Sequence, residues 1–216
     1  MTFKGVVFDL DGTLIDSKAD LAHAMNRVLL SEGFPIWPVE KYAFFVGKGI
    51  KNLVLNALPY NHRDDKTVMH CKEKIMTDYG SHYLIDTHIY TGILDLLEYI
   101  KKQNLKSIVF SNKPDEITQK IIKQLFINHS FDFVLGASEA LPTKPQPNGI
   151  FYICSKLGLN PTDLLYIGDS DVDMITAKNA GMKSIGATWG FRTENELINS
   201  GAWKIAHHPN EIINFL

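Results

Sequence analysis

Short apolar runs alternate with helical patterns along most of this chain, and that alternation narrows the possible folds more than any other feature. Runs rich in β-branched and aromatic residues occupy residues 5–8, 107–110, 131–135, 164–167 and 184–187. Periodic apolar residues and helix-ending signals predict helices at 92–103, 114–126, 147–157 and 170–180. Strands that alternate with helices form parallel sheets, because each crossover helix brings the chain back to the same edge. The pattern predicts an α/β fold with a Rossmann-like parallel sheet core.

One segment, residues 16–85, departs from this alternation. It lacks a convincing strand-like run, and its apolar spacing predicts helices at 18–32, 39–45, 50–58 and 64–83. We expect a helical cap subdomain over 16–85, inserted into an α/β core made of residues 1–15 and 86–216. Because the insertion follows the first strand, it would rise from the carboxyl edge of the sheet and cover a site there. The alternative is a helical layer packed on one sheet face.

Composition favours a protein that acts on small molecules. The chain has 216 residues, of which 45% are hydrophobic, and a formal net charge of -2. This charge provides no basic field for nucleic acid and no polybasic membrane signal. No apolar stretch approaches the roughly 18 residues of a membrane span, so we expect a cytoplasmic monomer or homodimer. Cys71 and Cys154 form neither a CxxC pair nor a disulfide framework, which indicates reduced thiols.

The segment Asp9-Leu10-Asp11-Gly12-Thr13 directly follows the first apolar run. On an extended strand, residues i and i+2 point the same way, so the two carboxylates would share one face. Like charges this close are costly unless a cation or a shared proton intervenes. The carboxyl end of a buried strand lies in the crevice where open α/β sheets bind ligands. An Asp-Gly turn that merely ends the strand is the simpler alternative, but it needs only one aspartate.

Three further polar clusters lie near predicted strand ends: Ser111-Asn112-Lys113, Lys144-Pro145-Gln146-Pro147 and Gly168-Asp169-Ser170-Asp171-Val172-Asp173. The first precedes a predicted helix, whose amino terminus favours anions, although Ser and Asn are also ordinary N-caps. The lysine of the second cluster, taken alone, is typical of a solvated side chain. In the third, Ser170 and Asp173 have capping-box spacing, whereas Asp169 precedes the cap and is not explained by it.

Together the clusters contain the groups that phosphoryl chemistry requires. Mg²⁺ prefers carboxylate and carbonyl oxygens, which Asp9, Asp11 and Asp169 offer, and phosphate oxygens require donors such as Ser111 and Lys144. The chain resembles the haloacid dehalogenase superfamily, whose four motifs match the segments above in order. Within it, the cap position and residues 44–49 and 188–192 resemble the phosphoglycolate phosphatase group.

This resemblance implies the catalytic roles. Asp9 would be the nucleophile and form an aspartyl-phosphate. Asp11 would protonate the leaving oxygen and later take a proton from water, while its backbone carbonyl joins the metal shell. Asp169 would complete the Mg²⁺ site with Asp9 and Asp11. Asp173 would support that site without binding the metal directly.

The resemblance also implies which residues hold the phosphoryl group. Ser111 and Lys144 would bind its oxygens, Thr13 would orient the site, and Asn112 would shape the same binding loop. In the cap, Lys48 lies between two glycines and would meet an anionic substrate when the cap closes. A solvated lysine in a flexible loop is the alternative for Lys48.

The residues at positions 11 and 21 distinguish a phosphatase from related activities of the superfamily. Dehalogenases lack an aspartate at the position of Asp11, and cation pumps carry a different residue there. The β-phosphoglucomutase group has a histidine where this chain has Leu21, and His23 would point elsewhere on the helix. The sequence predicts a Mg²⁺-dependent phosphatase for a small phosphomonoester such as phosphoglycolate. Inorganic pyrophosphatase, phosphomutase and a non-enzymatic phosphate-binding regulator stay open as alternatives.

Overall fold

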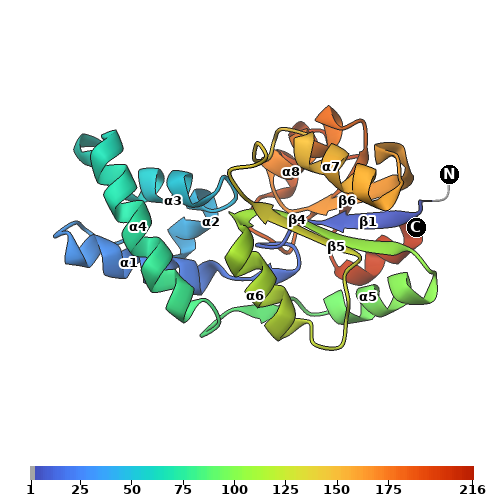
Figure 1. Ribbon diagram of the computed structural model, residues 1–216, viewed down its shortest axis with the longest axis horizontal. Coiled ribbons are helices and arrows are strands. Elements are labelled where there is room, and N and C mark those ends of the chain that lie inside the picture. Colours follow the sequence, from blue (N-terminus) through green and yellow to red (C-terminus); the bar gives the residue numbers. More distant parts are fainter. Residues whose placement is uncertain (1–2) are drawn as a thin grey trace.

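The computed structural model describes residues 3–216 and contains a six-stranded sheet in which every pair of neighbours is parallel (Figure 1). The strands are β1 (Gly5–Phe8), β4 (Lys106–Pro114), β5 (Phe133–Ala137), β6 (Leu164–Gly168), β7 (Lys183–Ala187) and β8 (Lys204–Ala206). Their order is β5-β4-β1-β6-β7-β8, which places β1 between β4 and β6. The predicted α/β class with a parallel sheet is confirmed.

Helices cover both faces of the sheet, and this explains why its strands are apolar without alternation. Val6 and Phe8 of β1 belong to one apolar cluster, and Val7 between them belongs to another. The first cluster includes α5 (Ile93–Lys102), α6 (Asp115–Leu125) and η4 (Pro209–Phe215), and the second includes α7 (Asn148–Leu157) and α8 (Asp171–Asn179). A further helix, α9 (Glu194–Asn199), packs beside β7 and β8.

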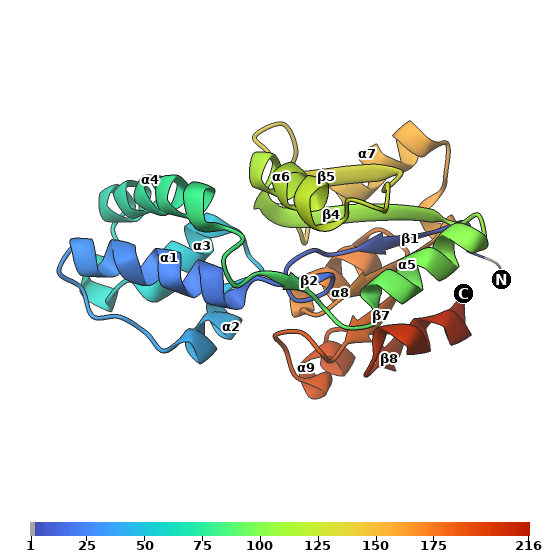
Figure 2. The same ribbon diagram turned by 90° about the horizontal axis from the view of Figure 1, so that it is seen from below.

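A separate group of helices lies beyond the carboxyl ends of the strands and does not cover a sheet face (Figures 1 and 2). Its members are α1 (Lys18–Ser31), α2 (Tyr42–Phe45), α3 (Ile50–Ala57) and α4 (Asp65–His82), with short 3-10 helices at Val39–Lys41 and Tyr60–His62. Asp64 caps α4 by accepting a hydrogen bond from the Thr67 amide at 3.0 Å. α1, α3 and α4 begin and end within one residue of the predicted bounds, and the predicted helix 39–45 is divided into the 3-10 helix Val39–Lys41 and α2. We call this group the cap helices.

Two short strands that the sequence did not reveal join the cap helices to the rest of the chain. β2 (Ile15–Asp16) pairs antiparallel with β3 (His88–Ile89), so the two connecting segments run side by side. Strands of two residues are too short to produce an alternating pattern, which is why the sequence analysis missed them. The short strand β8 was missed for the same reason.

Two strands, β4 and β5, differ from their predicted bounds by more than one residue. β5 begins at Phe133, because the preceding Asp132 turns its carboxylate to the Ser107 amide at 2.9 Å. β4 continues to Pro114, although its register with β5 shifts after Phe110. The Ser111-Asn112-Lys113 cluster thus lies in the extended end of a strand, and not in a turn at the start of α6. Within residues 3–216, no helix is long and apolar enough to cross a membrane, and both cysteines are buried and free.

Candidate active site

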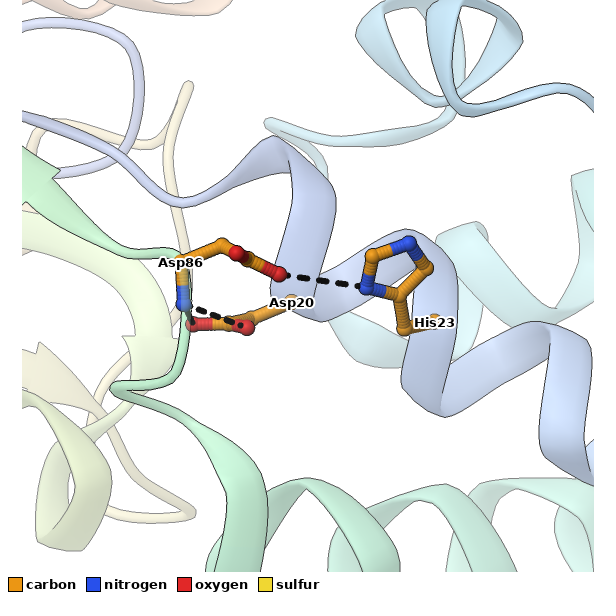
Figure 3. A group of neighbouring side chains, drawn as sticks. All are labelled: Asp20, His23 and Asp86. Atoms are coloured by element: carbon orange, nitrogen blue, oxygen red, sulfur yellow. Dashed lines mark hydrogen bonds and ion pairs between the residues drawn. The ribbon is translucent and has the colours of Figure 1, made fainter.

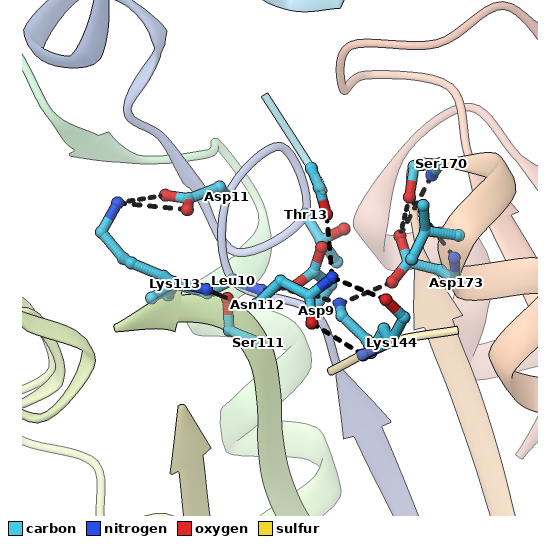
Figure 4. Close-up of polar contacts among 12 residues, drawn as sticks. Asp9, Leu10, Asp11, Thr13, Ser111, Asn112, Lys113, Lys144, Ser170 and Asp173 are labelled. Atoms are coloured by element: carbon cyan, nitrogen blue, oxygen red, sulfur yellow. Dashed lines mark hydrogen bonds and ion pairs between the residues drawn. The ribbon is translucent and has the colours of Figure 1, made fainter. Parts of the chain in front are cut away.

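The predicted polar clusters meet at the carboxyl edge of the sheet (Figure 4). Asp9 follows β1, Ser111 lies near the end of β4, and Asp169 follows β6. Lys144 comes from the segment between β5 and α7. All four side chains are buried, so the edge provides an enclosed polar site and not a solvated rim.

Three buried carboxylates lie close together, and the Lys144 ammonium contacts two of them. Oxygens of Asp9, Asp169 and Asp173 lie within 4.8 Å of one another. Lys144 Nζ lies 2.8 Å from Asp9 Oδ1 and 2.8 Å from Asp173 Oδ1. One ammonium therefore pairs with two of the three acids, which leaves the group short of positive charge.

The pKa values reflect this imbalance. Burial and, after it, the charge of Asp173 raise the pKa of Asp9 to about 7, although Lys144 offsets part of the rise. Burial, followed by Asp173 and Asp9, also raises the pKa of Asp169 well above its ordinary value. Burial alone would lower the pKa of Lys144, but Asp173 and Asp9 outweigh that effect and raise it. An all-oxygen site with surplus negative charge fits a hard dication such as Mg²⁺.

Asp173 is held by the start of α8. Its Oδ2 accepts hydrogen bonds from the Ser170 amide at 3.1 Å and the Ser170 hydroxyl at 2.6 Å, which confirms the predicted capping box. Its Oδ1 accepts from Tyr166 Oη at 3.2 Å and from Lys144. With both oxygens engaged by protein donors, Asp173 is placed to hold Lys144.

Asp169 is framed by two distant segments. Thr13 Oγ1 donates to Asp169 Oδ1 at 3.3 Å, and the Phe191 amide donates to Oδ2 at 2.7 Å. Gly12 has φ +86°, and a Cβ on it would lie 2.2 Å from Asp169 Oδ2. Only glycine fits this turn. Phe191 received no site role from the sequence, although its segment had been noted for its resemblance to phosphoglycolate phosphatases.

Asp11 takes a direction different from that of Asp9. The two carboxylates were expected on one face of a strand, but β1 ends at Phe8, so strand alternation does not extend to them. Asp11 points toward Lys113, whose Nζ lies 2.8 Å from Oδ1 and 3.1 Å from Oδ2 (Figure 4). Ser17 Oγ also donates to Asp11 Oδ1. The Asp11 side chain is thus not a member of the three-carboxylate group, and the predicted contact of its backbone carbonyl with a metal stays a prediction.

The sequence analysis assigned no role to Lys113. Burial would lower its pKa, but the charge of Asp11 outweighs that effect and raises it. The available signal was a lysine at the end of a strand buried on both faces. Such a lysine needs a nearby carboxylate.

Asn112 joins three parts of the site through its side-chain amide. Oδ1 accepts from the Lys144 amide at 2.8 Å, and Nδ2 donates to the carbonyls of Lys144 and Gly47 at 3.1 Å each. These bonds hold the Lys144 segment in place, as expected for a residue that shapes the loop. Ser111 lies beside it, and its hydroxyl accepts from the Lys113 amide at 3.2 Å.

A small cavity separates the site from the cap helices. The core lines it with polar residues that include Asp9, Asp11 and Ser111, and the cap lines it with the apolar residues Leu21, Val46, Ile50 and Leu53. Its volume of about 20 Å³ holds about one water molecule. A phosphomonoester requires more space than this arrangement provides.

The structure does not bring Lys48 into this cavity. Its side chain is 53% exposed, and its Nζ lies 3.1 Å from Asp171 Oδ2 at the start of α8. The predicted substrate contact by Lys48 stays a prediction. Arg192 also connects the core with the cap, because its guanidinium donates to the carbonyls of Ala43 and Val46.

A second group with metal-like composition, Asp20, His23 and Asp86, lies at the joint between α1 and the segment before β3 (Figure 3). Both Asp20 oxygens accept backbone hydrogen bonds from residues 85–87 at 2.9 to 3.1 Å. His23 Nδ1 lies 3.3 Å from Asp86 Oδ2 in an exposed pair. Asp20 therefore fastens the joint, and its lone pairs are already in use.

The chain is similar to known proteins over most of its length. The sequence profile described as haloacid dehalogenase-like hydrolase matches residues 6–187. A phosphoglycolate phosphatase from Pseudomonas fluorescens (strain Pf0-1) is 34% identical over 190 residues, covering 86% of this chain and 70% of the relative. One from Mannheimia succiniciproducens is 31% identical over 204 residues, covering 92% and 91%.

A crystal structure from Lactobacillus delbrueckii subsp. bulgaricus matches with a TM-score of 0.92 at 31% identity, covering 98% of this chain and 97% of that chain. The chain belongs to the haloacid dehalogenase-like hydrolase family. The resemblance drawn from the four motifs is confirmed.

Proposed function

We propose that this protein is a Mg²⁺-dependent phosphatase that hydrolyses a small phosphomonoester through an aspartyl-phosphate on Asp9. The observation that carries the proposal is the buried group of Asp9, Asp169 and Asp173, in which the ammonium of Lys144 pairs with Asp9 and Asp173. Relatives named phosphoglycolate phosphatase support phosphoglycolate or a similar compound as the substrate.

The first step transfers the phosphoryl group to the protein. A carboxylate oxygen of Asp9 attacks phosphorus, and the bond from phosphorus to the leaving oxygen breaks. Asp11 gives its proton to that oxygen, so a neutral alcohol departs. Lys144 and Ser111 offer donors to the phosphoryl oxygens. Mg²⁺, held by Asp9, Asp169 and the Asp11 carbonyl, would supply positive charge to the same oxygens.

The second step releases phosphate. Asp11, now a carboxylate, takes a proton from a water molecule that attacks the phosphorus of the intermediate. The bond between phosphorus and the Asp9 oxygen breaks, inorganic phosphate forms, and both aspartates return to their starting states. Asp11 therefore needs access to the leaving oxygen and later to water, and its place on the cavity wall suits both roles.

Residue 21 favours hydrolysis over phosphomutase chemistry. Leu21 is buried and lines the cavity at the position where the β-phosphoglucomutase group carries histidine. Its apolar side chain cannot move a proton there. His23 faces the exposed Asp86 instead.

We also propose that residues 16–85 act as a movable cap on a core of residues 1–15 and 86–216. The support is the cavity of about 20 Å³, which is too small for a phosphomonoester while the cap helices lie in the described position. Substrate entry would then require the two parts to separate.

The test is a phosphate-release screen with and without Mg²⁺. It includes phosphoglycolate, pyrophosphate and β-glucose 1-phosphate, and compares wild type with Asp9→Asn. We expect Mg²⁺-dependent release by wild type and less than about a hundredth of that rate from Asp9→Asn, because an amide cannot replace the nucleophile. Asp16→Asn, outside the site, is the control and should stay active.

Acid-quenched protein should carry ³²P from a labelled substrate in wild type and not in Asp9→Asn. Substantial activity in Asp9→Asn, or phosphate release that does not depend on a divalent metal, would contradict the proposal. Preference for pyrophosphate or for β-glucose 1-phosphate would select one of the alternative activities.

A further inference from the structure

Lys113 is a buried cation that the mechanism above does not use. It lies on β4 two residues after Ser111, and its side chain is 1% exposed. Its Nζ contacts both oxygens of Asp11, at 2.8 and 3.1 Å, and Ser17 Oγ donates to one of them. Two donors from different elements therefore fix the direction in which the Asp11 carboxyl points.

The Lys113 ammonium also contacts the cap helices. It lies 4.7 Å from the centre of the Tyr79 ring, which belongs to α4. Such a contact between an ammonium and an aromatic face is attractive, more so when both groups are desolvated. In the described part of the chain, the Tyr79 hydroxyl is the only buried side-chain polar atom without a hydrogen-bond partner. The tyrosine is therefore not kept there by a hydrogen bond within the cap.

A structural ion pair is the simplest alternative reading of Lys113. Buried pairs add little net stability, however, because desolvation offsets the attraction between the charges. A second lysine of β4 can be compared with Lys113. At the other end of this strand, Lys106 Nζ lies 2.7 Å from Asp132 Oδ1 in a more exposed ion pair. The Lys113 pair differs because both of its members line the cavity beside Asp9.

We propose that Lys113 is a positioning residue that holds the Asp11 carboxyl at the cavity wall, and that Tyr79 holds Lys113 while the cap lies on the core. Asp11 is then oriented for proton transfer only when the cap is in place. This inference rests on the proposed function, because it assumes that Asp11 protonates the leaving oxygen.

Leaving-group dependence tests the proposal. Phenyl phosphate and 4-nitrophenyl phosphate have nearly the same shape, but phenolate leaves far less readily and needs the proton more. We expect Lys113→Met to lower kcat/KM about tenfold to a hundredfold with phenyl phosphate and less than about threefold with 4-nitrophenyl phosphate. Lys106→Met removes a lysine from the same strand and should change neither value.

A double-mutant cycle of Lys113 and Asp11 distinguishes positioning from a purely structural role, because only a positioning role makes the effect of one substitution depend on the other. In an Asp11→Asn background, Lys113→Met should cost less than about threefold with phenyl phosphate, because the group it positions is already gone. Tyr79→Phe keeps the ring and should resemble wild type. Tyr79→Leu removes the ring and should lower kcat/KM with phenyl phosphate about threefold to tenfold.

Equal losses on the two substrates, or full additivity with Asp11→Asn, would overturn the inference. If circular dichroism shows that Lys113→Met does not fold, the two Tyr79 variants provide the test. Equal kcat/KM values with phenyl phosphate for Tyr79→Leu and Tyr79→Phe would then overturn the inference. An active Asp9→Asn variant would instead refute the proposed function. The two failures are therefore distinguishable.

Discussion

Asp9 carries a charge that its surroundings only partly stabilise. The carboxylate is buried near Asp169 and Asp173, and the ammonium of Lys144 is shared with Asp173. Burial raises the pKa of Asp9 to about 7, compared with an ordinary value of 3.8. In the absence of metal and between about pH 4 and 7, the folded protein therefore keeps a proton on Asp9 that the unfolded chain would release.

This pKa shift predicts how the metal-free protein responds to pH. Because the folded pKa is raised, the stability linked to Asp9 is fully present below about pH 4 and is lost as pH rises through about 7. Asp9→Asn removes the ionisable group. In urea unfolding with EDTA at pH 8, it should therefore raise the free energy of unfolding by at least about 1 kcal/mol relative to wild type. At pH 4 the difference should shrink.

Adding Mg²⁺ at pH 8 should stabilise wild type and have little effect on Asp9→Asn, because in the proposed site the ion would bind the folded state through this carboxylate. If the two proteins have equal free energies of unfolding at both pH values without metal, the pKa of Asp9 is not raised in the folded protein.

At the scale of elements, the joint between α1 and the segment before β3 depends on Asp20. Its side chain is buried and accepts the backbone amides of Ile85, Asp86 and Thr87, as well as the Thr87 hydroxyl at 2.7 Å. A helix of the cap is thereby attached to the segment that returns to the core. One side chain thus controls how the two connecting segments lie beside each other.

Asp20→Ala should lower the free energy of unfolding by about 2 to 4 kcal/mol, because several buried donors lose a charged acceptor. Chemical denaturation measures this directly. The matched control is Asp86→Ala, which removes only the exposed contact with His23 and should change stability by less than about 0.5 kcal/mol. Similar effects from the two variants would mean that Asp20 does not fasten the joint.

At the scale of the whole molecule, the cap helices lie beside the sheet and its flanking helices along the length of the molecule (Figure 2). Polar contacts around the site help to join these two parts. Arg192 donates to the carbonyls of Ala43 and Val46, and Asn112 donates to Gly47. These contacts hold the cap over a cavity too small for substrate. They must therefore break if the cap opens during turnover.

Arg192→Ala should make amide hydrogen exchange in residues 43–49 about tenfold faster or more, because a charged donor to two carbonyls is lost. Arg63 provides the matched control. It donates to the carbonyls of Leu58 and Asn56, entirely within the cap helices. Arg63→Ala should leave exchange in 43–49 unchanged, and unchanged exchange in Arg192→Ala would show that this contact does not hold the cap.

Much of the architecture followed from local patterns. Continuous apolar runs and helix signals depend on neighbouring residues, so they predicted five strands of the main sheet and the cap helices. Because parallel strands end at one edge, the same assignment also predicted that Asp9, Ser111 and Asp169 would meet. Lys144 was grouped with them because its segment also lies near a predicted strand end, although a lysine there, taken alone, is typical of a solvated side chain.

Only the tertiary structure decided where the site's side chains point. Asp11 turns to Lys113, which lies 102 positions away in the sequence, because β1 ends before the acidic pair and alternation stops there. Lys48 meets Asp171 and stays outside the cavity, and Tyr79 reaches Lys113 from the cap. These contacts join elements that are distant in the chain, so their geometry depends on how the cap packs against the sheet edge. Local periodicity contains no information about that packing.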